Sequence, residues 1–290
     1  MKFSSVLVAF LASFVVAEEQ PACGVPIVYR LFTQPELSAP LHKDCPANAD
    51  LPLSCSKEIT DKDSLCCVQQ PGGLVLLAQF WDYDPGFGPE DAFTLHGLWP
   101  DNCDGTYQQY CDKEQEVSNV TDIIKKLEPS LLDYMNEHWV SDDGDNESFW
   151  EHEWNKHGTC MSTLNPSCYK EGTDKHQNVA DYARTAIALQ KELNTFGFLG
   201  SKGIWPSDDK TYPKQDIEAA LKYHHSNSKV HIACDKSGAL NEVWYYFHIQ
   251  GAIPSAEYTP VDDTIPKNNC PDQVKYLPKK FNSTKPATGY

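Results

Sequence analysis

Short apolar runs along the chain predict four β-strands. The clearest is GLVLLAQFW at residues 73–81, which lies between the turn-forming Pro71-Gly72 pair and the DPGFGP segment. An apolar run of that length between turn signals is typical of a buried strand. Similar runs occur at residues 92–99, 230–234 and 242–251. We expect these runs to form the strands of a central sheet.

Three other segments have the spacing of helices. In residues 178–194, apolar side chains recur at three- and four-residue steps, which predicts one amphipathic face. Residues 121–139 have a helical pattern broken at Pro129, and residues 214–225 form a shorter candidate. Helices and strands interleave without regular alternation. This order favours an α+β fold with a mainly antiparallel central sheet, flanking helices and a single domain.

Both ends of the chain differ from the middle. Residues 1–17 join a lysine to an apolar stretch of secretory length that ends Val15-Val16-Ala17, which predicts a cleaved signal peptide. Glycosylation sequons at three positions agree with secretion: Asn119, Asn146 and Asn282. The expected organisation is a signal peptide at 1–17, an N-terminal extension and candidate propeptide at 18–44, a catalytic domain at 45–275 and a flexible tail at 276–290.

Cysteine usage and charge restrict the function further. The chain has eleven cysteines and a formal net charge of −17. In a secreted protein we expect disulfides, with Cys23 as the unpaired one because it lies in a turn-prone, Pro-rich stretch. Zinc binding, the competing use of cysteine, favours closely spaced CxxC-type pairs, whereas here Cys66 and Cys67 are adjacent and the others are scattered. The acidic charge is unusual for a protein that binds nucleic acid, so it stands as an objection to any such function.

Two segments concentrate histidines beside other reactive side chains. FTLHGLWPDNC at 93–103 ends a predicted strand, and FWEHEWNKHGTC at 149–160 predicts a helix that stops at Gly158. Trp150 and Trp154 lie four apart and would anchor that helix. The opposite side would present an acid, a cation and two imidazoles: Glu153, Lys156, His152 and His157.

Each segment also has a plain structural interpretation. A charged helix face is usually solvated, and a lone histidine such as His96 in a strand is usually structural. His152 and His157 are one residue too far apart for the HExxH zinc motif. A cysteine protease would need a free thiol, and no GxSxG elbow of a serine hydrolase is present. The nearby Trp99, Asp101 and Tyr107 could instead stack on a base and accept from its amino group.

The two segments resemble the active-site signatures of the ribonuclease T2 family, acid endoribonucleases that cut single-stranded RNA. The likeness includes CC at 66–67, QFWDYDPGFGPEDAFTLHGLWP, TLNPSCY and the C-terminal cysteines, and it extends from about Cys45 to Cys270. It implies low base specificity and cleavage through a 2′,3′-cyclic phosphate to 3′-phosphate ends. His157 resembles the base and His96 the acid, and no metal or cofactor is implied.

The resemblance also implies roles for other residues. Lys156 and Glu153 would stabilise the charge of the pentacovalent phosphate, and His152 would hold a phosphate oxygen. The residues that match the two base pockets are Trp99, Asp101 and Tyr107 in the first, and Gln79 and Phe149 in the second. The implied disulfides are Cys45–Cys67, Cys55–Cys103, Cys66–Cys168, Cys111–Cys160 and Cys234–Cys270.

The expected protein is thus a monomeric, secreted or vacuolar acid ribonuclease, with RNA as its partner and no membrane association. Two alternatives stay open at this point. One is a catalytically idle member of the same family that acts as a secreted binding or signalling protein. The other is an unrelated disulfide-rich extracellular binding module, which would leave both signatures unexplained.

Overall fold

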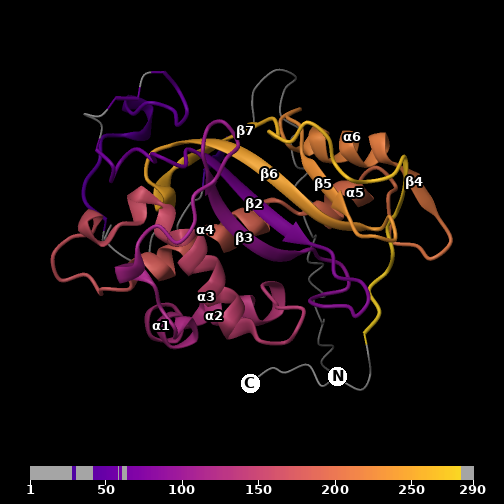
Figure 1. Ribbon diagram of the computed structural model, residues 1–290, viewed down its shortest axis with the longest axis horizontal. Helices are drawn as coiled ribbons and strands as arrows, with labels where there is room; N and C mark the ends of the chain where they lie inside the picture. Colours follow the sequence, from indigo (N-terminus) through magenta and orange to yellow (C-terminus); the bar gives the residue numbers. More distant parts are fainter. Residues whose placement is uncertain (1–27, 31–41, 58, 61–63, 282–290) are drawn as a thin grey trace, which may run out of the picture.

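A central β-sheet organises the protein (Figure 1), which was analysed as a computed structural model. The structure describes residues 28–30, 42–57, 59–60 and 64–281. The expected signal peptide, Cys23 and the sequon at Asn282 lie outside the described residues, so they stay predictions.

The sheet is antiparallel throughout its described pairings. Its strands follow the order β1 (Tyr29–Arg30), β7 (Glu257–Val261), β6 (Leu240–Gln250), β2 (Leu74–Phe80) and β3 (Thr94–Asp101), and β5 (His231–Cys234) also pairs with β6. A small second sheet joins β4 (Thr211–Pro213) to β8 (Gln273–Lys275). The expected α+β class with a mainly antiparallel sheet is confirmed.

The helices flank this sheet. They are α1 (Val120–Leu127), α2 (Pro129–His138), α3 (Asn146–Lys156), α4 (Gln177–Glu192), α5 (Thr195–Gly200) and α6 (Lys214–His224). Short 3₁₀ turns span Asn48–Asp50, Lys113–Gln115, Gly158–Cys160, Ser162–Leu164, Pro166–Cys168 and Ile253–Ser255. Pro129 separates α1 from α2 as expected, because proline fits the first position of a helix and not its interior.

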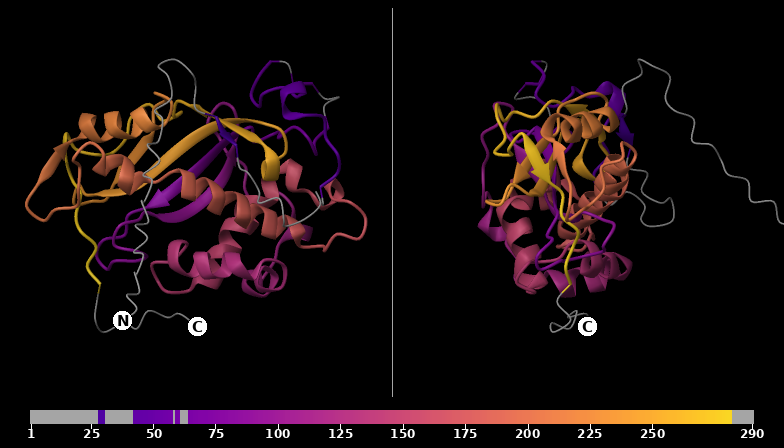
Figure 2. Two further views of the ribbon diagram at one scale, coloured as in Figure 1. Left: turned by 180° about the vertical axis from the view of Figure 1, so that it is seen from behind. Right: turned by 90° about the vertical axis from the view of Figure 1, so that its right-hand side faces the viewer.

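The two faces of the sheet have different roles. Side chains alternate along a strand, so Val75 and Leu77 of β2 face the main core whereas Leu74 and Leu76 face the other way. Helix α4 contacts β2 and β3, and it crosses the core face of the sheet when the molecule is seen from behind (Figure 2). The opposite face, which we call the open face, is the one turned toward the viewer in Figure 1.

The packed domain extends beyond both limits expected from the sequence. On the N-terminal side, Tyr29 pairs with Tyr258 of β7 and is buried. On the C-terminal side, Tyr276 is fully buried, and the Trp81 indole donates to the Leu277 carbonyl at 2.7 Å. Lys279 donates to the carbonyl of Ala92 at 2.9 Å. The start of the expected tail is therefore part of the fold.

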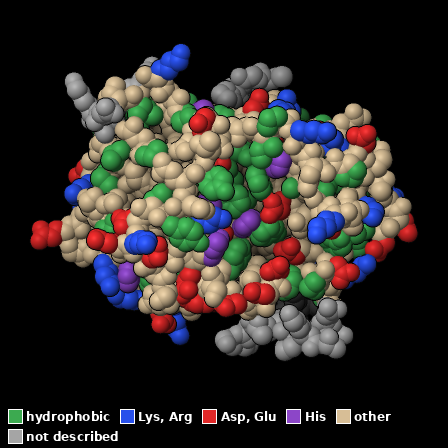
Figure 3. All heavy atoms as spheres, viewed as in Figure 1, with side chains coloured by type: hydrophobic (Ala, Val, Ile, Leu, Met, Phe, Trp, Pro, Cys, Tyr) green, Lys and Arg blue, Asp and Glu red, His purple; other side chains and the backbone are tan. Residues whose placement is uncertain are grey.

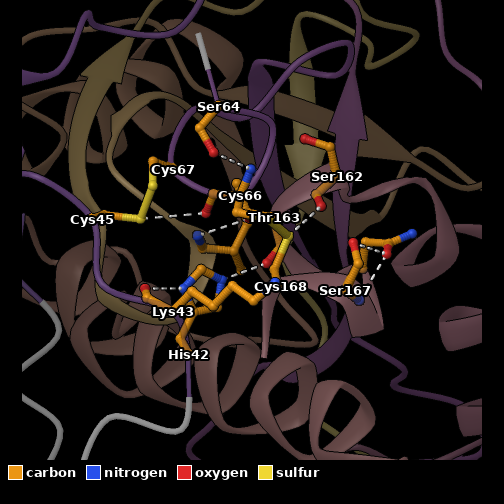
Figure 4. Close-up of a disulfide and its surroundings, with 12 residues drawn as sticks. His42, Lys43, Cys45, Ser64, Cys66, Cys67, Ser162, Thr163, Ser167 and Cys168 are labelled. Carbon is orange, nitrogen blue, oxygen red and sulfur yellow. Dashed lines mark hydrogen bonds between the residues drawn. A yellow bond between two sulfur atoms is a disulfide. The ribbon is translucent and has the colours of Figure 1, made fainter. Parts of the chain in front are cut away.

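Five disulfides join distant parts of the chain, and they are the five pairs that the family resemblance implies: Cys45–Cys67, Cys55–Cys103, Cys66–Cys168, Cys111–Cys160 and Cys234–Cys270. The adjacent Cys66 and Cys67 are tied to different segments (Figure 4). Beside them, the His42 Nε2 lies 2.8 Å from the Thr163 carbonyl. This network fastens the N-terminal segment onto the loop that follows the second histidine segment.

Two further features bear on the expectations from sequence. Asn119 is exposed just before α1, whereas Asn146 begins α3 and accepts from the Ser141 amide at 2.9 Å. Within the described residues, no helix has the length and apolar character needed to cross a bilayer.

Candidate active site

His96 occupies an irregularity in β3. Ala78 pairs with Gly97 and Gln79 with Leu95, so His96 is an extra residue in the ladder between β2 and β3. Such a bulge re-aims a side chain. The carbonyl of His96 is held by the Trp139 indole, which donates to it at 2.9 Å. The bulge thus places the imidazole on the open face.

Aromatic rings and carboxylates surround the His96 ring. Phe80 stacks on it at 3.9 Å between centroids, and Trp99 meets it edge-on at 4.7 Å. Its Nε2 lies 3.7 Å from a carboxylate oxygen of Glu153, and its Nδ1 lies 3.3 Å from one of Glu242. With a fifth of its side chain exposed, the ring is both fixed and reachable.

Helix α3 supplies the second histidine segment. Asp145 caps it by accepting from the Ser148 amide at 3.1 Å, and His157 follows its last residue. Trp150 and Trp154 are buried, as the spacing predicts. Glu153 and His157 are buried as well, at 1% and 4% exposure, so the expectation of one charged outer face is wrong for these two. Both side chains contact Trp99 of β3, Glu153 through the indole N–H and His157 through ring stacking.

Glu153 is a buried carboxylate held from β3. It accepts from the Trp99 indole at 2.7 Å, and burial raises the pKa of this carboxyl group. Gly97 makes the approach possible, since a Cβ at that position would overlap the Glu153 carboxylate and the Trp99 indole. The Tyr182 hydroxyl of α4 lies 3.1 Å from the Leu98 carbonyl and 3.4 Å from that of Glu153. One phenol therefore connects both active-site segments.

His157 is poised as a base. Its ring stacks on Trp99 at 4.9 Å with an interplanar angle of 20°. Neither ring nitrogen has a hydrogen-bond partner among the residues that the structure describes. Burial, with the nearby charge of Lys156, lowers the pKa of His157 to about 2. The imidazole is consequently neutral, and a neutral imidazole can accept a proton.

The remaining catalytic candidates lie at the surface of the same site. His152 is exposed and Lys156 partly exposed. Burial of its inner side, followed by the charge of Lys156, lowers the pKa of His152. The Tyr110 hydroxyl lies 3.4 Å from His152 Nδ1, and its amide donates to the Lys156 carbonyl at 3.0 Å. Tyr110 is a neighbour that the sequence did not single out.

The expected base-binding residues divide into two groups. Trp99 and Asp101 belong to the end of β3, and Asp101 forms an isolated antiparallel β-bridge with Tyr107. Tyr107 is 61% exposed, and burial raises the pKa of Asp101 to about 7. Phe149 lies on the other side, 5.9 Å from the His96 ring.

Gln79 does not belong to the site, and its expected role in base binding is wrong. Its side chain is fully buried on the core face, where it donates to the Leu193 carbonyl at 2.9 Å and accepts from the Thr195 hydroxyl. The reason is the regular alternation of β2, which puts Gln79 on the same face as the core residues Val75 and Leu77 and opposite Val243 of β6. A buried amide with satisfied partners is structural.

The structure adds residues that sequence reasoning missed. Alternation along β6 puts Glu242, Trp244, Tyr246 and His248 opposite open-face residues of β2. Trp244 lies 5.5 Å from Trp99 with the rings edge to face. The signal was available in EVWYYFHIQ, where every second residue of the predicted strand falls on one face. The space-filling view shows histidines gathered at the centre of this face among apolar side chains, with acidic groups beside them (Figure 3).

No group of three or more histidine, cysteine, aspartate or glutamate side chains within the described ranges could hold a metal ion. The groups present at this site are its imidazoles, the buried carboxylate of Glu153 and the lysine. A neutral imidazole, a second imidazole between carboxylates and a nearby ammonium group form an acid–base site for an anionic substrate.

Comparison with known proteins identifies the family to which this acid–base enzyme belongs. The model of the Ribonuclease T2 family matches residues 72–270. Ribonuclease T2 of Aspergillus oryzae is 46% identical over 242 residues, covering 83% of this chain and 86% of the relative. Ribonuclease M of Aspergillus phoenicis is 44% identical over 238 residues, covering 80% and 97%. The chain therefore belongs to the ribonuclease T2 family of endoribonucleases.

A solved structure agrees with this assignment. The crystal structure of Actibind, a T2 ribonuclease, matches with a TM-score of 0.77 at 44% sequence identity. The match covers 82% of this chain and 99% of that protein.

Proposed function

We propose that the protein is an acid endoribonuclease that cleaves single-stranded RNA through a 2′,3′-cyclic phosphate, leaving 3′-phosphate ends. One observation carries this proposal. The Trp99 indole contacts the rings of both His157 and His96, so two imidazoles of different environment flank one side chain. Two such groups are what general base and general acid catalysis on one phosphodiester require.

In the first step, neutral His157 removes the proton of the ribose 2′-hydroxyl. The 2′-oxygen forms a bond to phosphorus as the bond to the 5′-oxygen breaks, and His96 donates a proton to that leaving oxygen. In the second step, water attacks the cyclic phosphate, with His96 accepting the proton of water and His157 returning one to the 2′-oxygen. Each step leaves the protons balanced between the same two imidazoles.

The other polar groups act on the phosphate. Lys156 is the last residue of α3 and brings positive charge beside His157, where its ammonium group would neutralise the developing dianion. His152, exposed beside it, would hold a phosphate oxygen when protonated. A carboxylate oxygen of Glu153 lies 3.7 Å from His96 Nε2, where it would stabilise positive charge on the imidazole ring. These contributions are strongest in a site partly closed to water.

Broad base specificity fits the exposed aromatic surface. Tyr107 and the half-buried Trp99 can stack on any base, because every base has a π-face. Asp101, mostly protonated below its pKa of about 7, can donate to one base as well as accept from another. Phe149 would serve the base on the other side of the scissile phosphate.

The location and assembly state are also proposals. Ten of the eleven cysteines form disulfides in the structure, which fits a protein matured in an oxidising compartment. We propose a secreted or vacuolar monomer with RNA as its partner. Sedimentation of the mature protein would test the assembly state, and secretion from the source cells would test the location.

Product analysis at controlled pH tests the mechanism. Because His157 stays neutral well below the usual imidazole pKa of about 6.5, we expect activity to persist at pH 4–5 and to be lower above pH 7, where RNA meets a more strongly negative protein. RNA digested at acid pH in EDTA should yield 2′,3′-cyclic phosphate ends. His157→Ala and His96→Ala should each lower kcat by about 10²–10⁴.

Other outcomes would contradict this function. A rate that still climbs above pH 7, or full inhibition by EDTA, would rule out the proposed chemistry. A folded and fully oxidised protein without any cleavage would instead favour an idle binding protein of the same fold.

A further inference from the structure

Glu242 lies against the nitrogen of His96 that faces away from Glu153. Its carboxylate Oε1 is 3.3 Å from His96 Nδ1, whereas Glu153 Oε1 is 3.7 Å from Nε2. The imidazole is thus placed between two carboxylates, one on each ring nitrogen. Glu153 comes from α3 and Glu242 from β6, so separate elements hold the two sides of the ring.

The structure offers Nδ1 no other partner. Among the described residues this nitrogen is buried and makes no aligned hydrogen bond, so the Glu242 contact is close but not yet straight. Catalytic hydrogen bonds are often poorly aligned in a ligand-free site and tighten when substrate binds. A small rotation of the carboxylate or the ring would complete the bond.

Glu242 is itself fixed. Its second oxygen accepts from the Trp244 indole at 3.0 Å, and 17% of its side chain is exposed. The register places it opposite Phe80 of β2, whose ring stacks on the His96 imidazole. The same pair of strands therefore supplies the ring that covers His96 and the carboxylate that orients it.

We infer that Glu242 is a positioning residue for the general acid, holding the Nδ1–H of His96 so that Nε2–H points at the departing 5′-oxygen. During RNA cleavage, the Nε2 proton moves to the 5′-oxygen as the phosphorus–oxygen bond breaks. The Nδ1 proton stays on the ring, where its hydrogen bond to the Glu242 carboxylate is kept. A carboxylate that orients an imidazole in this way fixes its tautomer and stabilises its cationic form.

This inference rests on the proposed function, and the test separates the two. The variant Glu242→Gln keeps shape and loses charge. Its kcat/KM is measured on a dinucleoside phosphate, whose alkoxide leaving group needs a proton, and on a uridine 3′-(4-nitrophenyl phosphate), whose phenolate does not. We expect about a tenfold loss on the dinucleoside phosphate and less than twofold on the nitrophenyl ester.

His96→Ala is the benchmark, because loss of the acid itself must show the same dependence on the leaving group. A double-mutant cycle then tests whether Glu242 acts through His96. In the His96→Ala background, Glu242→Gln should cause no further loss on the dinucleoside phosphate, since the residue it positions is gone. Trp244→Phe, which frees the second oxygen of Glu242, should give a smaller loss with the same selectivity.

Three results would overturn the inference. These are an equal loss on both substrates, no loss on either, or a loss that adds fully to that of His96→Ala. Unfolding curves for each variant show whether it is folded, and Trp244→Phe gives an independent reading if Glu242→Gln is not. Absence of dinucleoside cleavage by the unaltered protein would instead disprove the proposed function.

Discussion

At the scale of residues, the site depends on the space that Gly97 leaves open. Glu153 reaches the Trp99 indole only because no Cβ stands between them. Glu153, His157 and Asp101 are buried to different extents. Burial raises the pKa of the two carboxyl groups and lowers that of the imidazole, so the neutral form is favoured in each case. Each of these three side chains therefore resists taking on charge inside the site.

Asp101 should make stability depend on pH. Its folded-state pKa of about 7 lies above the unfolded value of about 3.9, so the folded protein binds a proton that the unfolded chain releases. This contribution to the free energy of unfolding is fully present below about pH 4 and is lost as pH rises toward 7. In Asp101→Asn, the decrease in unfolding free energy between pH 4 and pH 7 should be smaller by about 1–2 kcal/mol, a value that allows for solvent contact of the carboxyl group.

Urea unfolding at pH 4 and pH 7 measures the difference. Asp104→Asn is the control, because hydrogen bonds from Thr106 lower the pKa of this exposed neighbour and its removal acts in the opposite sense. A gap between Asp101→Asn and the unaltered protein that is the same at both pH values would refute the assignment.

At the scale of elements, the bulge in β3 determines where the His96 side chain lies. Trp139, at the end of α2, donates to the carbonyl of the bulged residue, and its own carbonyl accepts from Trp150 of α3 at 2.7 Å. A chain of indoles therefore couples helix position to the orientation of His96.

Trp139→Phe should damage catalysis more than stability. Loss of one buried hydrogen bond costs about 1–2 kcal/mol, whereas a small misplacement of His96 should lower kcat/KM at least tenfold. Trp81→Phe is the matched control, because its equally buried indole donates to Leu277 away from the bulge. Steady-state kinetics and thermal unfolding of both variants test this. An equal loss of kcat/KM in the two variants would show that the Trp139 hydrogen bond to the bulge has no special role in catalysis.

The sequence predicts the long elements and misses the irregular ones. Apolar runs predict β2, β3, β5 and β6, and helical spacing predicts α4 and α6. The strand β7 was missed because EYTPV is short and contains Pro260, which is common only at the margins of sheets. The bulge was missed because one inserted residue leaves the apolar pattern of β3 almost unchanged. Gln79 was misplaced for another reason, since it alternates with Ala78 and Phe80 along β2 and therefore falls on the core face.

The site was predictable to a similar degree. Family resemblance pointed to His96, Glu153 and His157, and the structure brings them together around Trp99. The burial of Glu153 and His157 was not predictable, since helical spacing alone does not say which side a second element covers. Glu242 lay in a predicted strand, but its contact with His96 depends on the pairing of β6 with β2.

At the scale of the whole molecule, the negative net charge of the protein is compatible with RNA as its substrate. The formal charge is −17, and carboxylates lie close to the site, including Asp82, whose pKa burial raises to about 6. Lowering the pH protonates such groups while histidines gain charge, so repulsion of RNA weakens. The objection that composition raised against RNA binding therefore applies mainly at neutral pH.

The C-terminal segment closes the fold on the side of Trp81. Tyr276 is fully buried, and Lys279 lies 4.7 Å above the Trp81 ring, where burial lowers the pKa of its ammonium group to about 8. A chain ending at Lys275 should therefore lose about 3–5 kcal/mol of unfolding free energy, as for removal of a large core side chain. A chain ending at Phe281 keeps these contacts and is the comparison. Equal denaturation midpoints for the two chains would contradict the role of this segment.

The alternation along β6 has a practical consequence. Val243, Tyr245 and Phe247 belong to the core, while the residues between them face the site side of the sheet. His248, which is only half-buried, can therefore be randomised without disturbing the core, whereas Tyr246 is buried against Leu74 and Leu76 and should be kept. A library at this position, with Glu242 left intact, would show whether this face of the sheet influences base preference.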